Sequence, residues 1–195
     1  MDLNKLFKKI ATYIALVKQC TCVTAISAVY LGVAENNLTA NAQFFQNITD
    51  KIENNVPRLS YGVAVTDFNN DGKMEFIVTG FRYPNLALSY ENGSYKNINS
   101  SELFADEKRS SIGVVACDVD QDGYEEIYFL NTDTYSGTKK YSDRLIDVDK
   151  TIYDIFGFKK NQANLNLTAG RSVACVDRHG NGNYGIYVSN YGGPT

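Results

Sequence analysis

The sequence is poor in the residues that most enzyme sites and metal centres with soft ligands require. It contains one histidine and three prolines in 195 residues. Zinc sites and acid–base catalysis commonly use histidine side chains, so a single histidine disfavours both. The low proline count, together with 14 tyrosines and 10 phenylalanines, favours β-structure. These absences predict an all-β binding protein and no enzyme, with no catalytic residue.

A strong charge of one sign is also missing. The chain has 19 basic and 22 acidic residues, which leaves a net charge of −3. The basic residues form no run longer than Lys8-Lys9. Nucleic-acid binding depends on clustered cations. The sequence therefore predicts no nucleic-acid partner.

A hydrophobic run long enough to span a bilayer is absent from the N-terminal region. Basic residues precede a mostly apolar stretch from Ile10 to Ala34, whose uncharged part begins only at Cys20. This part is too short for a membrane-spanning helix, and it ends in the small-x-small pattern Gly32-Val-Ala34. We expect residues 1–34 to be a secretory signal peptide, with no stable membrane insertion after its cleavage. The alternatives are a mitochondrial presequence and an uncleaved signal anchor.

Five N-glycosylation sequons agree with a secreted, extracellular protein, although an Asn-rich chain also produces sequons by chance. They begin at Asn37, Asn47, Asn92, Asn99 and Asn166. Asn92 lies in an Asn-Gly turn and Asn99 directly follows an expected strand, so these two are the favoured acceptors. Beyond residue 34 only Cys117 and Cys175 remain, and an oxidising compartment permits one disulfide between them. Two buried free thiols are the alternative.

Two nine-residue windows carry the strongest functional signal. Asp67–Glu75 and Asp118–Glu126 each place oxygen-bearing side chains at positions 1, 3, 5 and 9, with glycine at position 6. Alternating oxygen ligands around a glycine turn suit Ca²⁺. The predicted ligands are Asp67, Asn69, Asp71, Glu75 and the Lys73 carbonyl in loop one, and Asp118, Asp120, Asp122, Glu126 and the Tyr124 carbonyl in loop two. Because Asn69 brings no charge, we expect weaker binding in loop one.

Other interpretations of such loops are available. Residues of this kind also favour plain solvated turns. An EF-hand would need a glutamate at position 12 and flanking helices, whereas position 12 here is Val78 or Phe129. A third loop, Asp177–Gly185, keeps one carboxylate and has His179 at position 3. We expect an ordinary turn there, with a solvated histidine and no calcium.

The three loops belong to a repeat. Their first aspartates, Asp67, Asp118 and Asp177, are 51 and 59 residues apart. Strand signals follow each other at 62–66, 75–79, 85–90 and 94–98, again at 112–117, 126–130, 143–148 and 151–155, and finally at 172–176 and 184–189. Four antiparallel strands per repeat of this length are typical of one β-propeller blade. Strand alternation points the two cysteines to opposite faces of consecutive blades, which permits a disulfide between blades.

The predicted architecture is all-β, a partial propeller of two full blades and half of a third. Its segments are a signal peptide (1–34), an N-terminal segment with a ring-closing strand near 45–48 (35–60), blade one with a calcium loop (61–110), blade two with a calcium loop (111–170) and a truncated blade three with a degenerate loop (171–195). Because propellers close with more blades, we expect a fragment of a longer protein that continues C-terminally.

Several strings resemble the FG-GAP/VCBS repeats of integrin α-chain propellers, and more closely the cartilage acidic protein family. They are Tyr61-Gly-Val-Ala-Val-Thr-Asp67, Ala116-Cys-Asp118, Glu125-Glu-Ile-Tyr-Phe-Leu-Asn131 and Ala169-Gly-Arg-Ser-Val-Ala-Cys-Val-Asp-Arg178. The resemblance covers Phe44 to the end. It implies a secreted, glycosylated, calcium-binding matrix protein with a propeller, followed in family members by a further domain and an EGF-like module.

The sequence thus predicts a secreted calcium-binding propeller glycoprotein that acts as an interaction scaffold for an extracellular protein or matrix partner. An integrin-α-like adhesion receptor is one alternative. A carbohydrate-active enzyme built on a propeller is another, but the chain has no Gly-x-Ser-x-Gly and its clustered carboxylates are assigned to metal loops.

Overall fold

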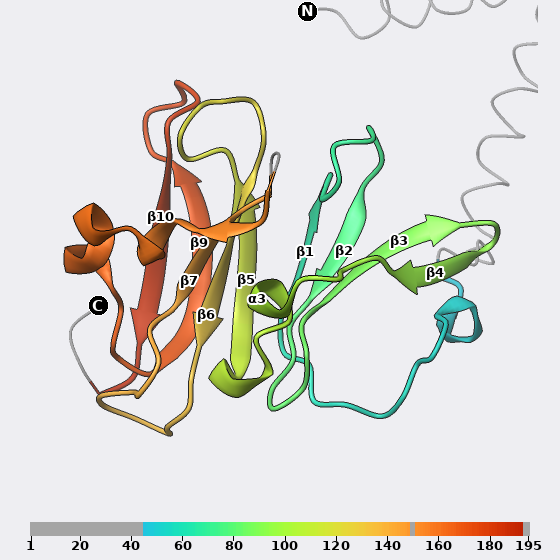
Figure 1. Ribbon diagram of the computed structural model, residues 1–195, viewed down its shortest axis with the longest axis horizontal. Coiled ribbons are helices and arrows are strands. Elements are labelled where there is room, and N and C mark those ends of the chain that lie inside the picture. The colour runs from blue at the N-terminus through green and yellow to red at the C-terminus, as the bar shows by residue number, and fades with distance from the viewer. Residues whose placement is uncertain (1–44, 149–150, 193–195) are drawn as a thin grey trace, which may run out of the picture. The chain divides into compact units, whose positions relative to one another are not determined.

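The computed structural model describes residues 45–148 and 151–192 (Figure 1). The chain divides into two compact units, Met1–Asn47 and Ile48–Thr195. Of the first unit only residues 45–47 are described, and they have no regular secondary structure, so the expected signal peptide lies outside the described residues. No helix in the described part is long and apolar enough to cross a membrane. Every described strand belongs to the second unit.

The first sheet has four antiparallel strands in the order β1-β2-β3-β4. They are β1 (Val63–Thr66), β2 (Glu75–Val78), β3 (Leu86–Glu91) and β4 (Ser94–Asn97). A two-residue hairpin joins the last two strands, and both of its residues, Asn92 and Gly93, have positive φ angles of 50° and 91°. Tight hairpin turns require these angles. The Asn-Gly pair therefore sets the register in which Glu91 faces Ser94.

The second sheet repeats this pattern, and a third begins it. The second sheet has the order β5-β6-β7-β8, with strands at Ser111–Cys117, Glu126–Asn131, Arg144–Asp147 and Tyr153–Asp154. The third is the antiparallel pair β9 (Gly170–Asp177) and β10 (Tyr184–Asn190). The predicted antiparallel four-stranded sheets are confirmed, and the predicted boundaries of these ten strands differ from the observed ones by at most two residues.

Short helical segments lie between and before these sheets. They are η1 (Thr49–Lys51), α3 (Glu102–Ala105), η2 (Glu107–Arg109), η3 (Ile155–Gly157) and η4 (Lys159–Asn164). The expected ring-closing strand at 45–48 is not formed; instead Ile52 makes an isolated parallel bridge with Tyr95 of β4. A closing strand pairs with the last sheet of a ring, which the described residues do not include. Ring closure therefore stays a prediction.

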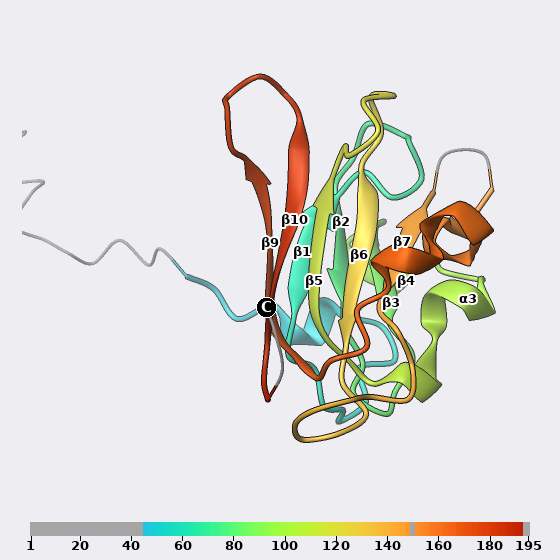
Figure 2. The same ribbon diagram turned by 90° about the vertical axis from the view of Figure 1, so that its left-hand side faces the viewer.

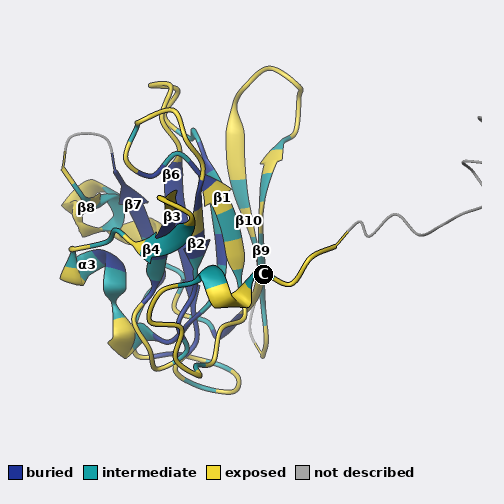
Figure 3. Cartoon of the chain, turned by 90° about the vertical axis from the view of Figure 1, so that its right-hand side faces the viewer, coloured by how far each residue is buried: buried dark blue, intermediate teal, exposed yellow. Residues whose placement is uncertain are grey.

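The first and second sheets pack around one hydrophobic core. Figure 2 views the strands from the side of β9 and β10. Ile77 of β2, Ile127 of β6 and Ile146 of β7 are fully buried in this core. The opposite face of the second sheet packs Leu130 against Val173 and its neighbours in the third pair. All six residues of β6 are buried because both faces of its sheet are covered, whereas β10 has no buried residue (Figure 3).

Two features bring the first strands of neighbouring sheets close together. A Cβ atom at Gly62 would lie only 3.0 Å from the Cα of Gly113, so a side chain there would push β1 away from β5. The second feature is a disulfide that joins Cys117 at the end of β5 to Cys175 in β9, with a Cα–Cα distance of 6.4 Å. Loops one and two each start immediately after the first strand of their sheet. The disulfide therefore anchors the strand from which loop two begins.

Candidate metal centre

Loop two gathers three carboxylates at the point where β5 ends and β6 begins. Each of Asp118, Asp120 and Glu126 offers one oxygen, and these oxygens lie within 4.8 Å of one another. Among the described residues, only this loop brings three acidic side chains so close. Three charged oxygens at this spacing fit a hard divalent cation such as Ca²⁺.

Backbone geometry holds the loop in this shape. Gln121 and Gly123 have φ angles of 66° and 94°, which turn the chain around the cluster. The amide of Gly123 donates to Asp118 Oδ2 at 3.1 Å, and the amide of Asp122 donates to Asp118 Oδ1 at 3.2 Å. Glycine suits such a position because it adopts positive φ without strain. The carboxylates are thus oriented by the chain itself, as a cation site requires.

The electrostatics of loop two favour a bound cation. Glu126 is 2% exposed, and burial, followed by repulsion from Asp120 and other acidic neighbours, raises its pKa to about 7. The amide of Val119 donates to Glu126 Oε2 at 2.7 Å and opposes this shift. Burial and the neighbouring carboxylates also raise the pKa of Asp120. A divalent cation would relieve both the desolvation and the repulsion.

Asp147 is a residue at this site that the sequence reasoning missed. It follows Ile146, which pairs with Ile127, so it lies across the strand pair from Glu126. Its side chain is 4% exposed and accepts a hydrogen bond from the Tyr153 hydroxyl. The available signal was an aspartate inside an otherwise apolar strand, Leu145-Ile-Asp-Val148. Like charges placed opposite each other across strands are destabilising unless something compensates them.

Loop one has the same backbone design and a different charge balance. Asp67 accepts hydrogen bonds from the amides of Asp71 at 3.0 Å and Gly72 at 2.8 Å, as Asp118 does in loop two. Glu75 is fully buried, and both of its oxygens already have donors: the Ser89 hydroxyl at 2.8 Å and the Phe68 amide at 3.0 Å. These donors satisfy the carboxylate without a metal.

The remaining predicted ligands of loop one and the Tyr124 position lie on the surface. Asp71 is paired with the Lys73 ammonium at 3.2 Å, and its pKa is lowered mainly by a hydrogen bond from the Lys73 amide. Asn69 and Lys73 are exposed, as are Asp122 and Tyr124 in loop two. None of these four side chains joins the cluster of Asp118, Asp120 and Glu126, in which Asp120 is itself exposed. The three-carboxylate cluster of loop two is therefore the better-formed site.

Loop three is a turn that satisfies its own carboxylate. Asp177 accepts hydrogen bonds from four backbone amides, those of His179, Gly180, Asn181 and Gly182, at 2.7–3.2 Å. These donors lower the pKa of Asp177, with the Gly182 amide contributing most. His179 is exposed, in keeping with the expected solvated histidine.

The predicted glycosylation sites differ in exposure. Asn47 and Asn92 are exposed, whereas Asn37 lies outside the described residues. Asn99 is partly buried and its amide nitrogen donates to the Ser101 carbonyl at 3.2 Å. The amide nitrogen of Asn166, the atom that would carry a glycan, donates to Asp143 and Asn190 at 2.6 and 3.0 Å. Asn92 is therefore better placed for modification than Asn166.

Comparison with known proteins connects this architecture to one family. Residues 31–129, slightly more than half of the chain, match the FG-GAP-like repeat. The chain is 41% identical over 179 residues to human "Cartilage acidic protein 1", which covers 83% of this chain and 27% of that protein. The proteins of the same name from Xenopus tropicalis and Mus musculus are 43% and 45% identical over 164 and 151 residues.

In these two comparisons the match covers 75% and 71% of this chain and 25% and 23% of the relatives. The chain thus spans about a quarter of the length of the relatives it matches. It belongs to the FG-GAP-like repeat proteins and, among them, to the cartilage acidic protein family.

Proposed function

We propose that this chain forms part of a secreted, calcium-binding β-propeller glycoprotein that serves as an extracellular interaction scaffold. The observation that carries the metal half of this proposal is the convergence of Asp118, Asp120 and Glu126 within 4.8 Å in loop two. Calcium there ties the end of β5 to the start of β6 and cancels the repulsion around a buried glutamate. The ion is structural, because its ligands belong to the turn that joins two paired strands of one sheet.

The propeller half is supported by the uncovered faces of the outer sheets. Val63 and Val65 of β1 are 61% and 51% exposed, although Ala64 between them packs against the core shared with the second sheet. Phe76 of β2 is exposed on the same side, and Val176 and Tyr187 are 43% and 62% exposed on the face of the third pair that points away from the second sheet. Apolar strand faces of this kind are normally covered by another layer. Further sheets of the same repeat on either side would bury them and continue a ring.

Extracellular placement is supported by the disulfide and by the surface position of Asn92. A disulfide between packed strands is stable in oxidising compartments. An asparagine at the tip of an exposed hairpin is accessible to the glycosylation machinery. The names of the relatives, which refer to cartilage, agree with a matrix environment.

Calcium titration of the full-length protein tests this proposal. Isothermal calorimetry should show binding at about 10⁻⁴–10⁻³ M, the range of extracellular modules. Asp120→Asn should weaken the binding, and Asp177→Asn in loop three should leave it unchanged. The metal site would be contradicted if calorimetry detected no heat of calcium binding. It would also be contradicted if Asp120→Asn did not alter the binding.

A further inference from the structure

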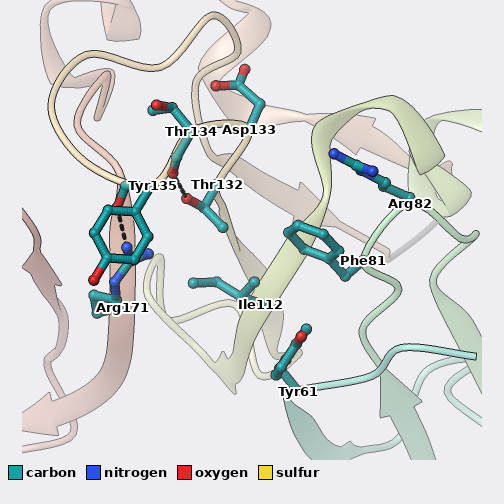
Figure 4. A pocket seen from close by; sticks show the side chains of 9 residues that line it. All are labelled: Tyr61, Phe81, Arg82, Ile112, Thr132, Asp133, Thr134, Tyr135 and Arg171. Carbon is teal, nitrogen blue, oxygen red and sulfur yellow. Dashed lines mark hydrogen bonds between the residues drawn. The ribbon is translucent and has the colours of Figure 1, made fainter.

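A pocket of about 610 Å³ lies at the opposite end of the strands from the acidic loops (Figure 4). Three of its residues, Tyr61, Ile112 and Arg171, each stand six positions before the first aspartate of their loop. Phe81 and Thr132 each stand fourteen positions after it. Equivalent repeat positions from neighbouring sheets therefore converge on one hollow, which belongs to the repeat architecture and is separate from the metal loops.

One wall of the pocket is a stacked arginine. The Arg171 guanidinium lies 5.3 Å from the centre of the Tyr135 ring and 5.1 Å from that of Tyr191, and these two rings contact each other edge to face at 5.3 Å. The same guanidinium donates to the carbonyls of Gly170 and Tyr135. These contacts hold the planar group in one orientation, as Figure 4 shows for Tyr135 and Arg171. A guanidinium fixed in this way is preorganised for a planar anion.

The opposite wall is aromatic and carries a second cation. Tyr61 and Phe81 contact each other edge to face at 5.7 Å, and the Arg82 guanidinium lies 5.6 Å from the Phe81 ring. Tyr61 and Tyr135 are 63% and 78% exposed at the rim. Exposed tyrosines next to arginines are the composition found at the energetic centres of protein interfaces.

The cations of this pocket have no carboxylate partner in the described part of the chain. Neither Arg82 nor Arg171 forms an ion pair within the described ranges. Asp133, the one acidic residue in the lining, is held by backbone amides: its Oδ2 accepts hydrogen bonds from the amides of Lys140 and Tyr141 at 2.9 and 3.0 Å. In Figure 4 its carboxylate points away from Ile112. Two guanidinium groups and one carboxylate leave the lining with a net positive charge between aromatic walls.

We propose that this pocket binds an acidic side chain, Asp or Glu, of a protein partner, with a neighbouring apolar residue of that partner against Tyr61 and Phe81. The proposal rests on the interaction function proposed above and names its surface and the chemistry of its partner. Charge complementarity supplies the anchor, since a guanidinium pairs with a carboxylate through two parallel hydrogen bonds. A sulfated glycan is disfavoured because a linear polyanion needs a track of cations. Here the adjoining pocket, which shares Arg82, adds Lys108 but also Glu107 and Asp133.

The test uses the full-length protein from a eukaryotic host and a random dodecapeptide display library as the probe. Peptides are selected against wild type and against Arg82→Ser/Arg171→Ser. Arg178→Ser is the matched control, because Arg178 is an exposed arginine just beyond the far end of β9. We expect peptides enriched on wild type and on the control to share an Asp or Glu next to an apolar residue, and to be lost on the double variant.

Affinity measurements on an enriched peptide sharpen this result. By fluorescence anisotropy, Arg171→Ser should weaken binding about tenfold or more. Arg171→Lys should recover only part of the loss, because it restores the charge without the planar fork. Replacing the acidic residue of the peptide by its amide should have the same effect as Arg171→Ser. Unchanged thermal melting of each variant shows that the fold is intact.

Three outcomes would overturn the proposal. Enriched peptides without an acidic residue, or with affinity unaffected by the arginine variants, would place binding elsewhere and leave the scaffold function standing. Binding of a chondroitin sulfate hexasaccharide with the same arginine dependence, in the absence of acidic peptides, would replace the peptide by a glycan. No enrichment of any peptide would contradict this site and leave the scaffold function standing, because that function also covers folded and matrix partners. Calcium binding is measured separately and does not enter these outcomes.

Discussion

Loop one and loop two have almost the same sequence pattern, and they differ in what lies across the strands from their last acidic residue. In loop one the buried Glu75 receives a hydrogen bond from the Ser89 hydroxyl of β3 at 2.8 Å. In loop two the equivalent strand position holds Asp147, a second buried carboxylate near Glu126. Loop one is thereby satisfied without a cation, whereas loop two accumulates negative charge that a cation would neutralise.

From this difference we expect that the ligand pattern of a loop does not by itself decide its affinity for a cation. Both loops orient their first aspartate with the same backbone amides, at positions 5 and 6 of the window. One difference lies inside the loop, where Asn69 stands in place of Asp120, and the other lies across the strands, where Ser89 stands in place of Asp147. The free energy of cation binding includes the relief of repulsion between carboxylates in the metal-free protein. The loop with the stronger repulsion in the absence of the ion is therefore stabilised more when the ion binds.

The largest effect is expected from removing the disulfide, which lies next to loop two and has no counterpart at loop one. Cys117 directly precedes Asp118, whereas Thr66 stands at the corresponding place before loop one. Cys117→Ser/Cys175→Ser should lower the free energy of unfolding by about 2–5 kcal/mol, as for other native disulfides. Chemical denaturation with and without calcium measures this loss. A lower calcium affinity at loop two, with an unchanged calcium affinity at loop one, would confirm that the disulfide supports loop two alone of these two. Equal losses of calcium affinity at both loops would contradict this.

The next largest effect should come from exchanging the residues opposite the two glutamates. Ser89→Asp removes the hydroxyl donor of Glu75 and adds a buried like charge, so the metal-free protein should lose about 1–3 kcal/mol of stability. Calcium should restore most of this loss, because the ion compensates both carboxylates. Thermal melting in EDTA and in calcium measures the difference.

Ser172→Asp, at an exposed serine of β9, is the control for the added charge. The reverse substitution, Asp147→Ser, should stabilise the metal-free protein and weaken calcium binding at loop two. Tighter calcium binding after Asp147→Ser would show that the carboxylate across the strands does not drive cation binding.

A third prediction compares the two glutamates directly. Glu126→Gln should weaken calcium binding at loop two at least tenfold, about 1.4 kcal/mol, because the site loses one of three clustered charges. Glu75→Gln should change the measured calcium binding much less, since Glu75 already has two protein donors. Terbium luminescence sensitised by the nearby tyrosines follows both variants. Equal losses in the two variants would mean that both loops bind with similar strength.

The smallest effect is a pH dependence of the metal-free protein. Burial and acidic neighbours raise the pKa of Glu126 from 4.5 to about 7, so the folded protein keeps a proton that the unfolded chain has released. Stability in EDTA should therefore fall as pH rises from about 4.5 to about 7. Glu126→Gln should remove this fall in stability between about pH 4.5 and about pH 7, and saturating calcium should remove it in the wild type. Denaturation midpoints at several pH values provide the measurement, and a slope that survives both changes would exclude Glu126 as its source.

Much of this architecture could be predicted from the sequence, for local reasons. The Asn92-Gly93 pair forces a tight hairpin whatever surrounds it, and the alternation of apolar residues marks β1 and β2 as strands. The glycine at position 6 of each loop marks the turn. The same reasoning predicts a strand at 45–48 that is not formed, because a single strand needs a neighbouring sheet edge, and no local pattern supplies one.

The sequence alone determined the repeat, the strand boundaries and the acidic residues of the loops, since each depends on neighbours within a few positions along the chain. Only the tertiary structure decided that Asp147 lies beside Glu126, that Ser89 satisfies Glu75, and that Arg82 and Arg171 come to one pocket. These relations join residues on different strands or sheets. The distance between such residues is set by register and packing, which no single segment of the chain contains.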